Sequence, residues 1–397
     1  MKLLKALGNP YFSFANSFLV ATILYSPSLS AIFPDFGFSI YFLLFATIST
    51  TYLLGTMSQK KVERIISAPV CNHPAYSTRI FIFALPFALL EIAANPNTPL
   101  MMAISGAATH KNFITEYGIP TIHALVVTLF QIVIVQGCNE LIARTEGRNK
   151  IFLSVCSATC FLIIFLSRGA LVICLLASIF CYLSSANKYR GKRIVATLIT
   201  VVFALYIFGW LGNLRTGDDE YILKIGGANT DVFGRIISSE FFWGYLYIAS
   251  PLANLALSIE LHESLRHFDL ITVVLLDIIP DVISKRITEF NEEWVTFRPL
   301  VDPALTVGTI FARPYFFGGP VGAAIVFLWT LFLIHVSLNV SEKSPYATTI
   351  LGFANALAFL CIFTNTAVFS GTIGPIYICL AFGFFKKLKW RTTRSNE

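Results

Sequence analysis

Ten apolar windows, each close to the length needed to cross a lipid bilayer, constrain the fold of this chain more than any other feature. A helix of about 20 apolar residues crosses roughly 30 Å of hydrocarbon. Because lone strands would leave backbone groups unpaired in lipid, the windows predict helices. They cover residues 12–32, 37–56, 77–95, 119–143, 151–167, 169–186, 194–212, 318–340, 347–367 and 370–386.

The composition favours a membrane protein. Of the 397 residues, 56% are hydrophobic and only 13% are charged, and the mean hydropathy is +0.72. Soluble domains carry about 25% charged residues. The first window follows a basic start without a small-residue cleavage site, so we expect a first span rather than a removed signal peptide. We expect the eight Cys residues to be small packing residues, and we expect neither a disulfide framework nor a metal site.

The distribution of Lys and Arg predicts the orientation in the membrane. Short basic loops stay in the cytoplasm, so we expect both termini to be cytoplasmic. The net charge of +7 then follows from the topology, and we expect no nucleic-acid partner. Most of the 29 Lys and Arg residues lie in six short segments with few carboxylates, which are 1–11, 57–76, 144–150, 187–193, 341–346 and 387–397.

One connection is much longer than the others and divides the chain into three predicted parts. These are a seven-span N-terminal bundle (1–212), a large periplasmic or interfacial loop subdomain (213–317), and a three-span C-terminal part with a basic cytoplasmic tail (318–397). Structureless loops of such length are uncommon and are usually functional. The predicted fold is therefore an all-α polytopic membrane protein with about ten transmembrane helices.

The long loop has apolar segments of its own. Residues 241–257 carry no charge and are interrupted by Pro251, and the stripe Leu257, Leu261, Leu265 and Phe268 is typical of a helix that lies in the membrane interface. We expect a re-entrant or surface-lying subdomain. The alternative is a further pair of spans, which would give twelve.

Arginines at the mouths of the windows form the core of the candidate site. An unpaired ionisable group at membrane depth costs about 2.5–3.5 kcal/mol on insertion scales. Guanidinium groups form paired hydrogen bonds with phosphate oxygens, so several of them around one cavity predict a lipid-linked phosphate or diphosphate ligand. For each arginine taken alone, the alternative is a solvated charge on the surface with no role in ligand binding. The four are Arg168, at the tip of a predicted helical hairpin, Arg215, Arg298 and Arg313.

Other side chains of the outer segments complete the candidate site. Arg298 and Arg313 each precede a Pro, which predicts loop geometry rather than a long helix. A carboxylate near the arginines would accept the proton of an acceptor hydroxyl, and the candidates are Asp218, Asp219 and Glu293. Aromatic side chains interleaved with these charges suit sugar binding or an interfacial belt. The candidate substrate-binding residues are Lys224, Arg235, Tyr245, Tyr315, His110 and Lys111.

Several common motifs are absent from the sequence. It contains no Walker A sequence, HExxH, CxxC pair, Rossmann glycine fingerprint or GxSxG elbow. We therefore expect no nucleotide cofactor and no catalytic metal. The energy for bond formation would come from an activated, lipid-borne substrate.

Four stretches, "FLSRGALVIC", "GWLGNLRTG", "YIASPLANL" and "PYFFGGPVGAA", together resemble the bacterial O-antigen polymerases, which are oligosaccharide repeat-unit polymerases. The spacing from Arg215 to Gly226 is similar to an Arg and Gly pair of that family. The resemblance implies a metal-independent glycosyltransferase that acts on the periplasmic face. Donor and acceptor would be oligosaccharides on undecaprenyl diphosphate, and a chain-length regulator protein would be a further partner.

The resemblance also implies roles for the arginines. They would stabilise the charge of the diphosphate leaving group, with Arg215 and Arg168 as first choices, followed by Arg298 and Arg313. The main alternative function is a flippase or transporter for lipid-linked oligosaccharide. Transporters bind at the bilayer midplane between repeated halves, whereas this chain has no visible repeat and few ions in its windows, of which Glu91 and Glu140 are the clearest. A membrane acyltransferase is a third option, but the sequence places no suitable His at membrane depth.

Overall fold

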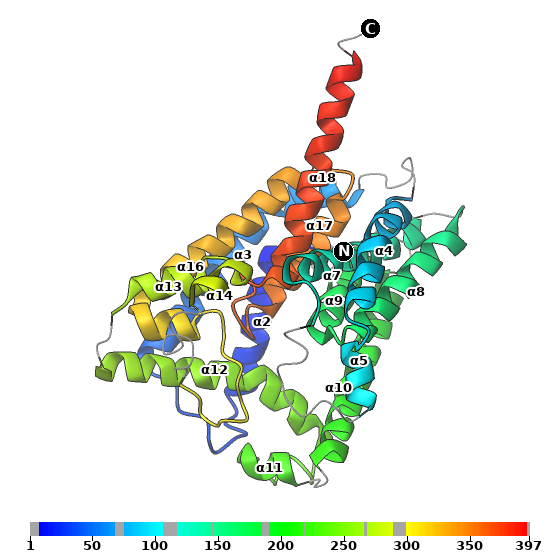
Figure 1. Cartoon of the computed structure of the whole chain (residues 1–397). Coiled ribbons are helices and arrows are strands. Elements are labelled where there is room, and N and C mark those ends of the chain that lie inside the picture. The colour runs from blue at the N-terminus through cyan, green and yellow to red at the C-terminus, as the bar shows by residue number, and fades with distance from the viewer. Residues whose placement is uncertain are drawn as a thin grey trace.

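The computed structural model is all-helical, which confirms the predicted fold class (Figure 1). In the described part of the chain, β pairing is limited to two isolated bridges. The structure describes residues 8–67, 75–105, 117–143, 146–184, 190–216, 220–265, 268–288, 299–342 and 344–394, without the side chains of 120, 190, 193, 194, 211, 214–216, 285, 288 and 383–394.

Each of the ten apolar windows forms a helix. These helices are α2 (Pro10–Tyr25), α3 (Phe38–Ser67), α4 (Tyr76–Ala94), α7 (Pro120–Ala143), α8 (Arg148–Ile164), α9 (Arg168–Ser184), α10 (Arg190–Thr216), α16 (Ala312–Ser341), α17 (Ala347–Leu360) and α18 (Ser370–Arg394). Five helices within the described residues are long and apolar enough to cross a membrane, namely α3, α4, α7, α16 and α12 (Glu240–Leu265). The protein is therefore membrane-embedded in character.

The helices alternate between two ends of the bundle. At one end, which we call the tail end, α3, α7, α9 and α16 finish, and α18 projects beyond the rest (Figure 1). An ion pair of 2.9 Å between Arg64 and Glu342 joins α3 to the residue after α16 there. We call the opposite end the α12 end. The short helices are α5 (Pro99–Ile104), α11 (Tyr221–Ile225), α13 (Leu270–Asp277) and α14 (Asp281–Thr288), and α13 packs against α16.

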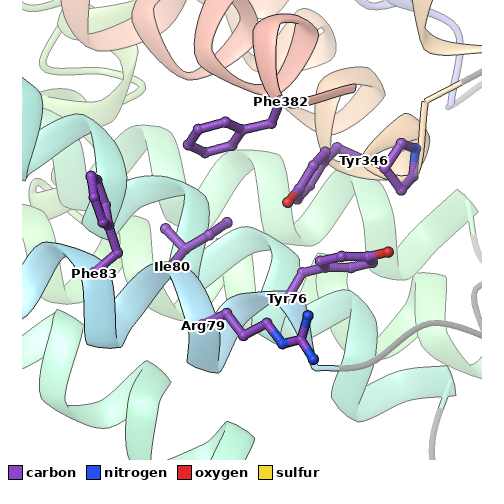
Figure 2. Close-up of a pocket in the computed structure, with 7 residues that line it drawn as sticks. Tyr76, Arg79, Ile80, Phe83, Tyr346 and Phe382 are labelled. Atoms are coloured by element: carbon purple, nitrogen blue, oxygen red, sulfur yellow. The ribbon is translucent and has the colours of Figure 1, made fainter. Parts of the chain in front are cut away.

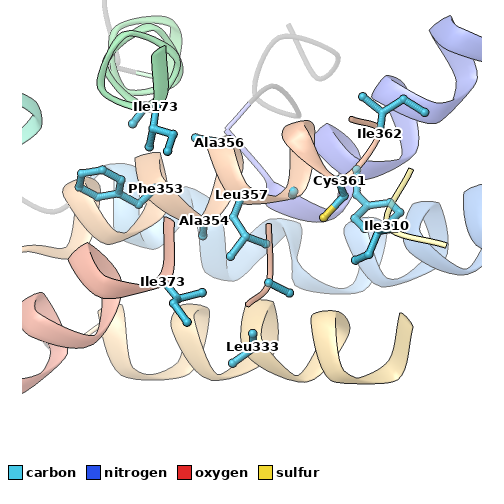
Figure 3. Packing of buried hydrophobic residues seen from close by; sticks show 14 of the residues in the cluster. Ile173, Ile310, Leu333, Phe353, Ala354, Ala356, Leu357, Cys361, Ile362 and Ile373 are labelled. Atoms are coloured by element: carbon cyan, nitrogen blue, oxygen red, sulfur yellow. The ribbon is translucent and has the colours of Figure 1, made fainter. Parts of the chain in front are cut away.

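The helix α17 lies at the centre of the hydrophobic core. All but three of its residues are buried, and it packs against α2, α9, α16 and α18. Figure 3 shows Phe353 and Leu357 of α17 among Ile173, Leu333 and Ile373 from neighbouring helices. Small residues of α17 allow this close approach, because a Cβ added at Gly352 would meet Cys181 Sγ of α9 at 2.5 Å.

The long helix of the loop segment, α12, runs crosswise beneath α2 and α16 (Figure 1). Of its apolar window, 83% is buried, which is more than in the other four helices that are long and apolar enough to cross a membrane. The helix continues through Pro251, so the predicted interruption at this proline is wrong. A proline costs a helix about 3 kcal/mol in isolation, and burial against α2, α10 and α16 offsets this cost.

The two helices after α12 are short. Each has eight residues, or about 12 Å at 1.5 Å per residue, which is less than the hydrocarbon thickness. Among the described residues between α12 and α16, no second helix is long enough to cross the hydrocarbon, as the twelve-span alternative would require. The apolar side chains at the α12–α13 junction remain outside the core, since Leu265, Phe268 and Ile271 are 59%, 60% and 70% exposed.

The eighth window begins earlier than predicted. The sequence places Arg313 in a loop because Pro314 follows it, but both lie in the first turn of α16. Proline is tolerated there because the first helical N–H groups need no intrahelical partner. The backbone then breaks at Gly319, which has φ 55° and ψ −150°, just before Pro320. Arg313 is thus carried by a short helical segment ahead of a kink.

Candidate functional site

A buried ion pair at the α12 end holds Arg313. Its Nε donates to Asp277 Oδ1 and Oδ2 at 3.1 and 3.2 Å, and its Nη2 donates to Oδ1 at 2.8 Å. Nη2 also donates to the carbonyl of Leu276 at 2.6 Å. The Asp277 side chain is 1% exposed and that of Arg313 is 33% exposed. The guanidinium is therefore fixed on one side and open on the other, and Nη1 donates to no described residue.

The turn between α17 and α18 braces this ion pair. Asn365 donates from Nδ2 to the backbone carbonyl of Asp277 at 2.9 Å and to its Oδ1 at 3.1 Å. A few residues on, the backbone N–H of Ser370 donates to Asp281 Oδ1 at 2.9 Å, and the N–H of Asp281 donates to Val368 O at 2.9 Å. These contacts tie α13 and α14 to the start of α18, so that the long loop segment is anchored to the bundle.

A second buried carboxylate pairs with a histidine near the α12 end. His123, in the first turn of α7, lies 3.2 Å through Nδ1 from Oε2 of Glu91, in the last turn of α4. Glu91 is fully buried, and its Oε1 has no hydrogen-bond partner among the described residues. His123 is 22% exposed. A carboxylate on Nδ1 holds the ring orientation and leaves Nε2 as the nitrogen for other partners.

The loop before α7 closes over the Glu91–His123 pair. Gly118 has φ +84°, and a Cβ at this position would meet both Glu91 Oε1 and His123 Nδ1 at 3.0 Å. Glycine permits this close approach of the backbone. Burial, and to a smaller degree the charge of Glu91, raises the pKa of the Tyr117 phenol, whose hydroxyl donates to Asn95 O at 3.2 Å. Glu91 is thus enclosed, while part of the His123 side chain stays accessible.

Contacts connect the two carboxylate centres along the α12 end. Arg286 of α14, which follows the Asp277 ion pair along the chain, donates to Thr121 Oγ1 at 3.3 Å, two residues from His123. On the other side, the His123 ring lies 5.2 Å from the ring of Phe165. Phe165 leads directly into the turn that carries Arg168. Polar groups from α4, α7, α13, α14 and α16 therefore follow one another across this end of the bundle.

Arg168 occupies the predicted hairpin tip. The turn joins α8 to α9. Arg168 is the first residue of α9, and its side chain is exposed. Leu166 adopts φ +50° in the turn, and its carbonyl accepts a hydrogen bond of 2.8 Å from the N–H of Arg168. The helical hairpin predicted from the sequence is confirmed, and Phe165, just before its tip, contacts the His123 ring.

The other described candidates lie in two kinds of environment. Lys224 pairs with Glu220 at 3.0 Å, and Arg235 with Asp231 at 3.7 Å, with all four side chains mostly exposed. Such i,i+4 surface pairs contribute little energy.

The two tyrosines are instead core residues. Tyr245 is 6% exposed and Tyr315 is 4% exposed. The Tyr245 ring packs on the rings of Phe233 and Phe242 at 5.6 Å, and the Tyr315 ring lies 5.7 Å from that of His262.

The remaining candidates are not described. The backbone of Arg215 lies in the last turn of α10, but its side chain lies outside the description. The residues that lie wholly outside the described ranges are His110, Lys111, Asp218, Asp219, Glu293 and Arg298. Asn254 nevertheless fixes the segment that follows Arg298, because its Nδ2 donates to Leu305 O and Val307 O, and its Oδ1 accepts from Val301 N.

Sequence reasoning missed the partners that organise this end. Asp277, Asn365 and His123 were not among the candidates, although an acid within an apolar stretch requires a partner and is therefore a usable signal. The partner itself could not be read, since Asp277 and Arg313 are 36 residues apart. Over the described residues, no group of three or more His, Cys, Asp or Glu side chains is placed to hold a metal ion.

No family model matches this chain, and no curated protein or solved structure is similar to it.

Proposed function

We propose that the protein is a membrane glycosyltransferase that polymerises oligosaccharide repeat units carried on undecaprenyl diphosphate. In this proposal the α12 end faces the periplasm and the tail end faces the cytoplasm of a bacterial inner membrane. The resemblance to O-antigen polymerases and the concentration of basic residues at the tail end support this assignment. The observation that carries the proposal is the Arg313 guanidinium, held by Asp277 with one side open.

The reaction transfers a glycan from a lipid diphosphate to a hydroxyl. The acceptor oxygen forms a bond to the anomeric carbon, the bond from that carbon to the diphosphate oxygen breaks, and undecaprenyl diphosphate leaves. Negative charge develops on the leaving diphosphate. Preorganised guanidinium groups stabilise such charge strongly where water is scarce. In this proposal Arg313, Arg168 and Arg215, each in the first or last turn of its helix, would supply this stabilisation.

The hydroxyl proton requires an acceptor. The Glu91–His123 pair suits this role, because Glu91 holds Nδ1 and leaves Nε2 for a substrate hydroxyl. Removal of a positioned base typically lowers the rate by about 10²–10⁴-fold. His123→Gln, which keeps a polar side chain at this position, is expected to fold and to lose transfer activity within that range.

The experiment uses the purified full chain in nanodiscs with a synthetic undecaprenyl-diphosphate repeat unit. A ladder of products without ATP, nucleotide sugar or added metal supports the proposal. Arg313→Lys and Arg215→Lys are expected to fold and to lose activity, because lysine cannot form the paired hydrogen bonds of a guanidinium. Arg64→Lys is the matched control, since Arg64 lies at the tail end and is 68% exposed.

Two results would reject the proposal. One is substrate that crosses the membrane of protein-loaded vesicles without any change in glycan length, which would indicate a flippase. The other is equal turnover in the wild-type protein, Arg313→Lys and His123→Gln, which would remove the α12 end from the chemistry.

A further inference from the structure

A separate cavity lies in the side of the bundle at the tail end. It has a volume of about 520 Å³, within the usual range for small-ligand sites. Its walls come from the first turns of α4, from the residues before α17, and from α18 (Figure 2). The lining residues are Tyr76, Arg79, Ile80, Phe83, Pro345, Tyr346 and Phe382.

One polar group points into this cavity without a protein partner. Tyr346 is only 6% exposed, and no described residue hydrogen-bonds to its hydroxyl, which Figure 2 shows directed between Ile80 and Phe382. Burial raises the pKa of the Tyr346 phenol, whereas the nearby charge of Arg79 acts in the opposite direction. The phenol is therefore a neutral hydrogen-bond donor that faces the cavity.

The cavity also contains a cation without an anion. Arg79 lines the cavity and is exposed, and among the described residues no carboxylate pairs with it. The nearest buried acid, Glu140, is already satisfied by the N–H of Tyr76, the hydroxyl of Ser77 and the amide of Gln136, at 2.9, 2.5 and 3.0 Å. Glu140 therefore caps α4 and leaves the charge of Arg79 for a ligand.

The rest of the cavity wall is apolar and faces outward from the bundle. Phe83 is 54% exposed, and its neighbour Ile82 is 62% exposed. In a membrane-embedded bundle, such an outward face meets hydrocarbon. A ligand that satisfies both Arg79 and this wall must combine an anionic headgroup with an alkyl chain.

We propose that this cavity binds a membrane phospholipid with a net anionic headgroup. Its phosphate accepts hydrogen bonds from Arg79 and Tyr346, and its acyl chain lies along Ile80, Phe83 and Phe382. The basic segments beside the tail end suit the anionic cytoplasmic leaflet. The site lies at the opposite end from the proposed reaction and does not depend on it.

The test is native mass spectrometry of the purified, delipidated full chain titrated with phosphatidylglycerol or with phosphatidylcholine. We expect saturable binding of one phosphatidylglycerol with clear preference over phosphatidylcholine. Arg79→Gln should weaken this binding by about tenfold, as expected for a lost charge-assisted hydrogen bond, and Tyr346→Phe by a smaller factor. Arg148→Gln is the control, because Arg148 is exposed at the tail end but does not line the cavity.

Three outcomes would overturn the proposal. Equal weakening by Arg79→Gln and Arg148→Gln would indicate a general surface-charge effect. Unchanged binding in Arg79→Gln would place the lipid elsewhere. Full displacement of the lipid by millimolar inorganic phosphate would indicate a site for free phosphate, in which the alkyl chain contributes nothing. Because Arg79 is on the surface, its substitution leaves the fold intact, and size-exclusion chromatography checks this directly.

Discussion

Replacing Arg313 should destabilise the protein more than replacing Asp277, although each change breaks the same ion pair. Arg313→Gln leaves a carboxylate that is 1% exposed without its countercharge. Removing one partner of a buried pair costs about 3–5 kcal/mol. Asp277→Asn leaves a guanidinium that is 33% exposed, so water solvates part of it. We expect this second change to cost only about 1–3 kcal/mol.

The double variant separates the interaction from the individual residues. Once neither charge is present, no uncompensated ion is left in the core. We therefore expect Arg313→Gln with Asp277→Asn to be more stable than Arg313→Gln alone. The coupling energy from the double-mutant cycle should be about 1–3 kcal/mol. Unfolding in mixed micelles, followed through the fluorescence of the five Trp residues, gives the four free energies of unfolding.

Additivity would refute this reasoning. If the losses of the two single variants sum to the loss of the double variant, the two side chains do not interact in the folded protein. A larger loss for Asp277→Asn than for Arg313→Gln would also contradict the burial on which the argument depends. The proposed catalytic role is tested separately, since Asp277→Asn keeps the guanidinium but releases its orientation. That variant should lose transfer activity beyond its loss of folded protein.

Three further substitutions test the fold, the first with a matched control. Gly319→Ala forces an alanine to φ 55° with its Cβ 2.5 Å from His262 Nε2, so it should lower the free energy of unfolding by about 1–3 kcal/mol. The control is Gly147→Ala, at φ +69° with nothing within 4 Å of the added Cβ, which should lower stability less in the same thermal melts. Asn254→Leu removes three hydrogen bonds to backbone groups and should expose residues 299–311 to limited proteolysis. The pKa of Tyr117 is raised in the folded state. The stability that this residue contributes is therefore complete below about pH 10 and is lost as the pH rises further. The melting temperature of Tyr117→Phe should depend less on pH in the alkaline range than that of the wild-type protein.

The sequence was sufficient to predict the helices of the bundle. Apolar segments of this length have only one way to satisfy their backbone in lipid, so hydropathy alone located all ten. The boundaries were less accurate where the apolar run and the helix do not coincide. Thr216 ends α10 beyond the apolar window, and Leu360 ends α17 before it, because capping and tertiary contacts determine where a helix stops.

Proline and charge caused the main errors. Local rules predicted breaks at Pro251 and at Pro314, yet burial keeps the first inside a helix, and the second occupies a first turn. The charge of Arg313 was recognised, but its partner Asp277 comes from a different helix. Pairs of this kind depend on which helices become neighbours, and no single-sequence pattern specifies that.

The contact between the first and the next-to-last helices of the bundle has a consequence for biosynthesis. Asn355 of α17 accepts from Ser13 and donates to the carbonyl of Gly8 at the start of α2. Of the two helices against which α2 packs most extensively, α3 follows it directly in the sequence, whereas α17 is translated much later. The contact between α2 and α17 therefore forms only after all the helices between them in the sequence have been translated. A chain truncated before α17 would leave α2, α7 and α9 without their common neighbour, as a target for membrane proteases.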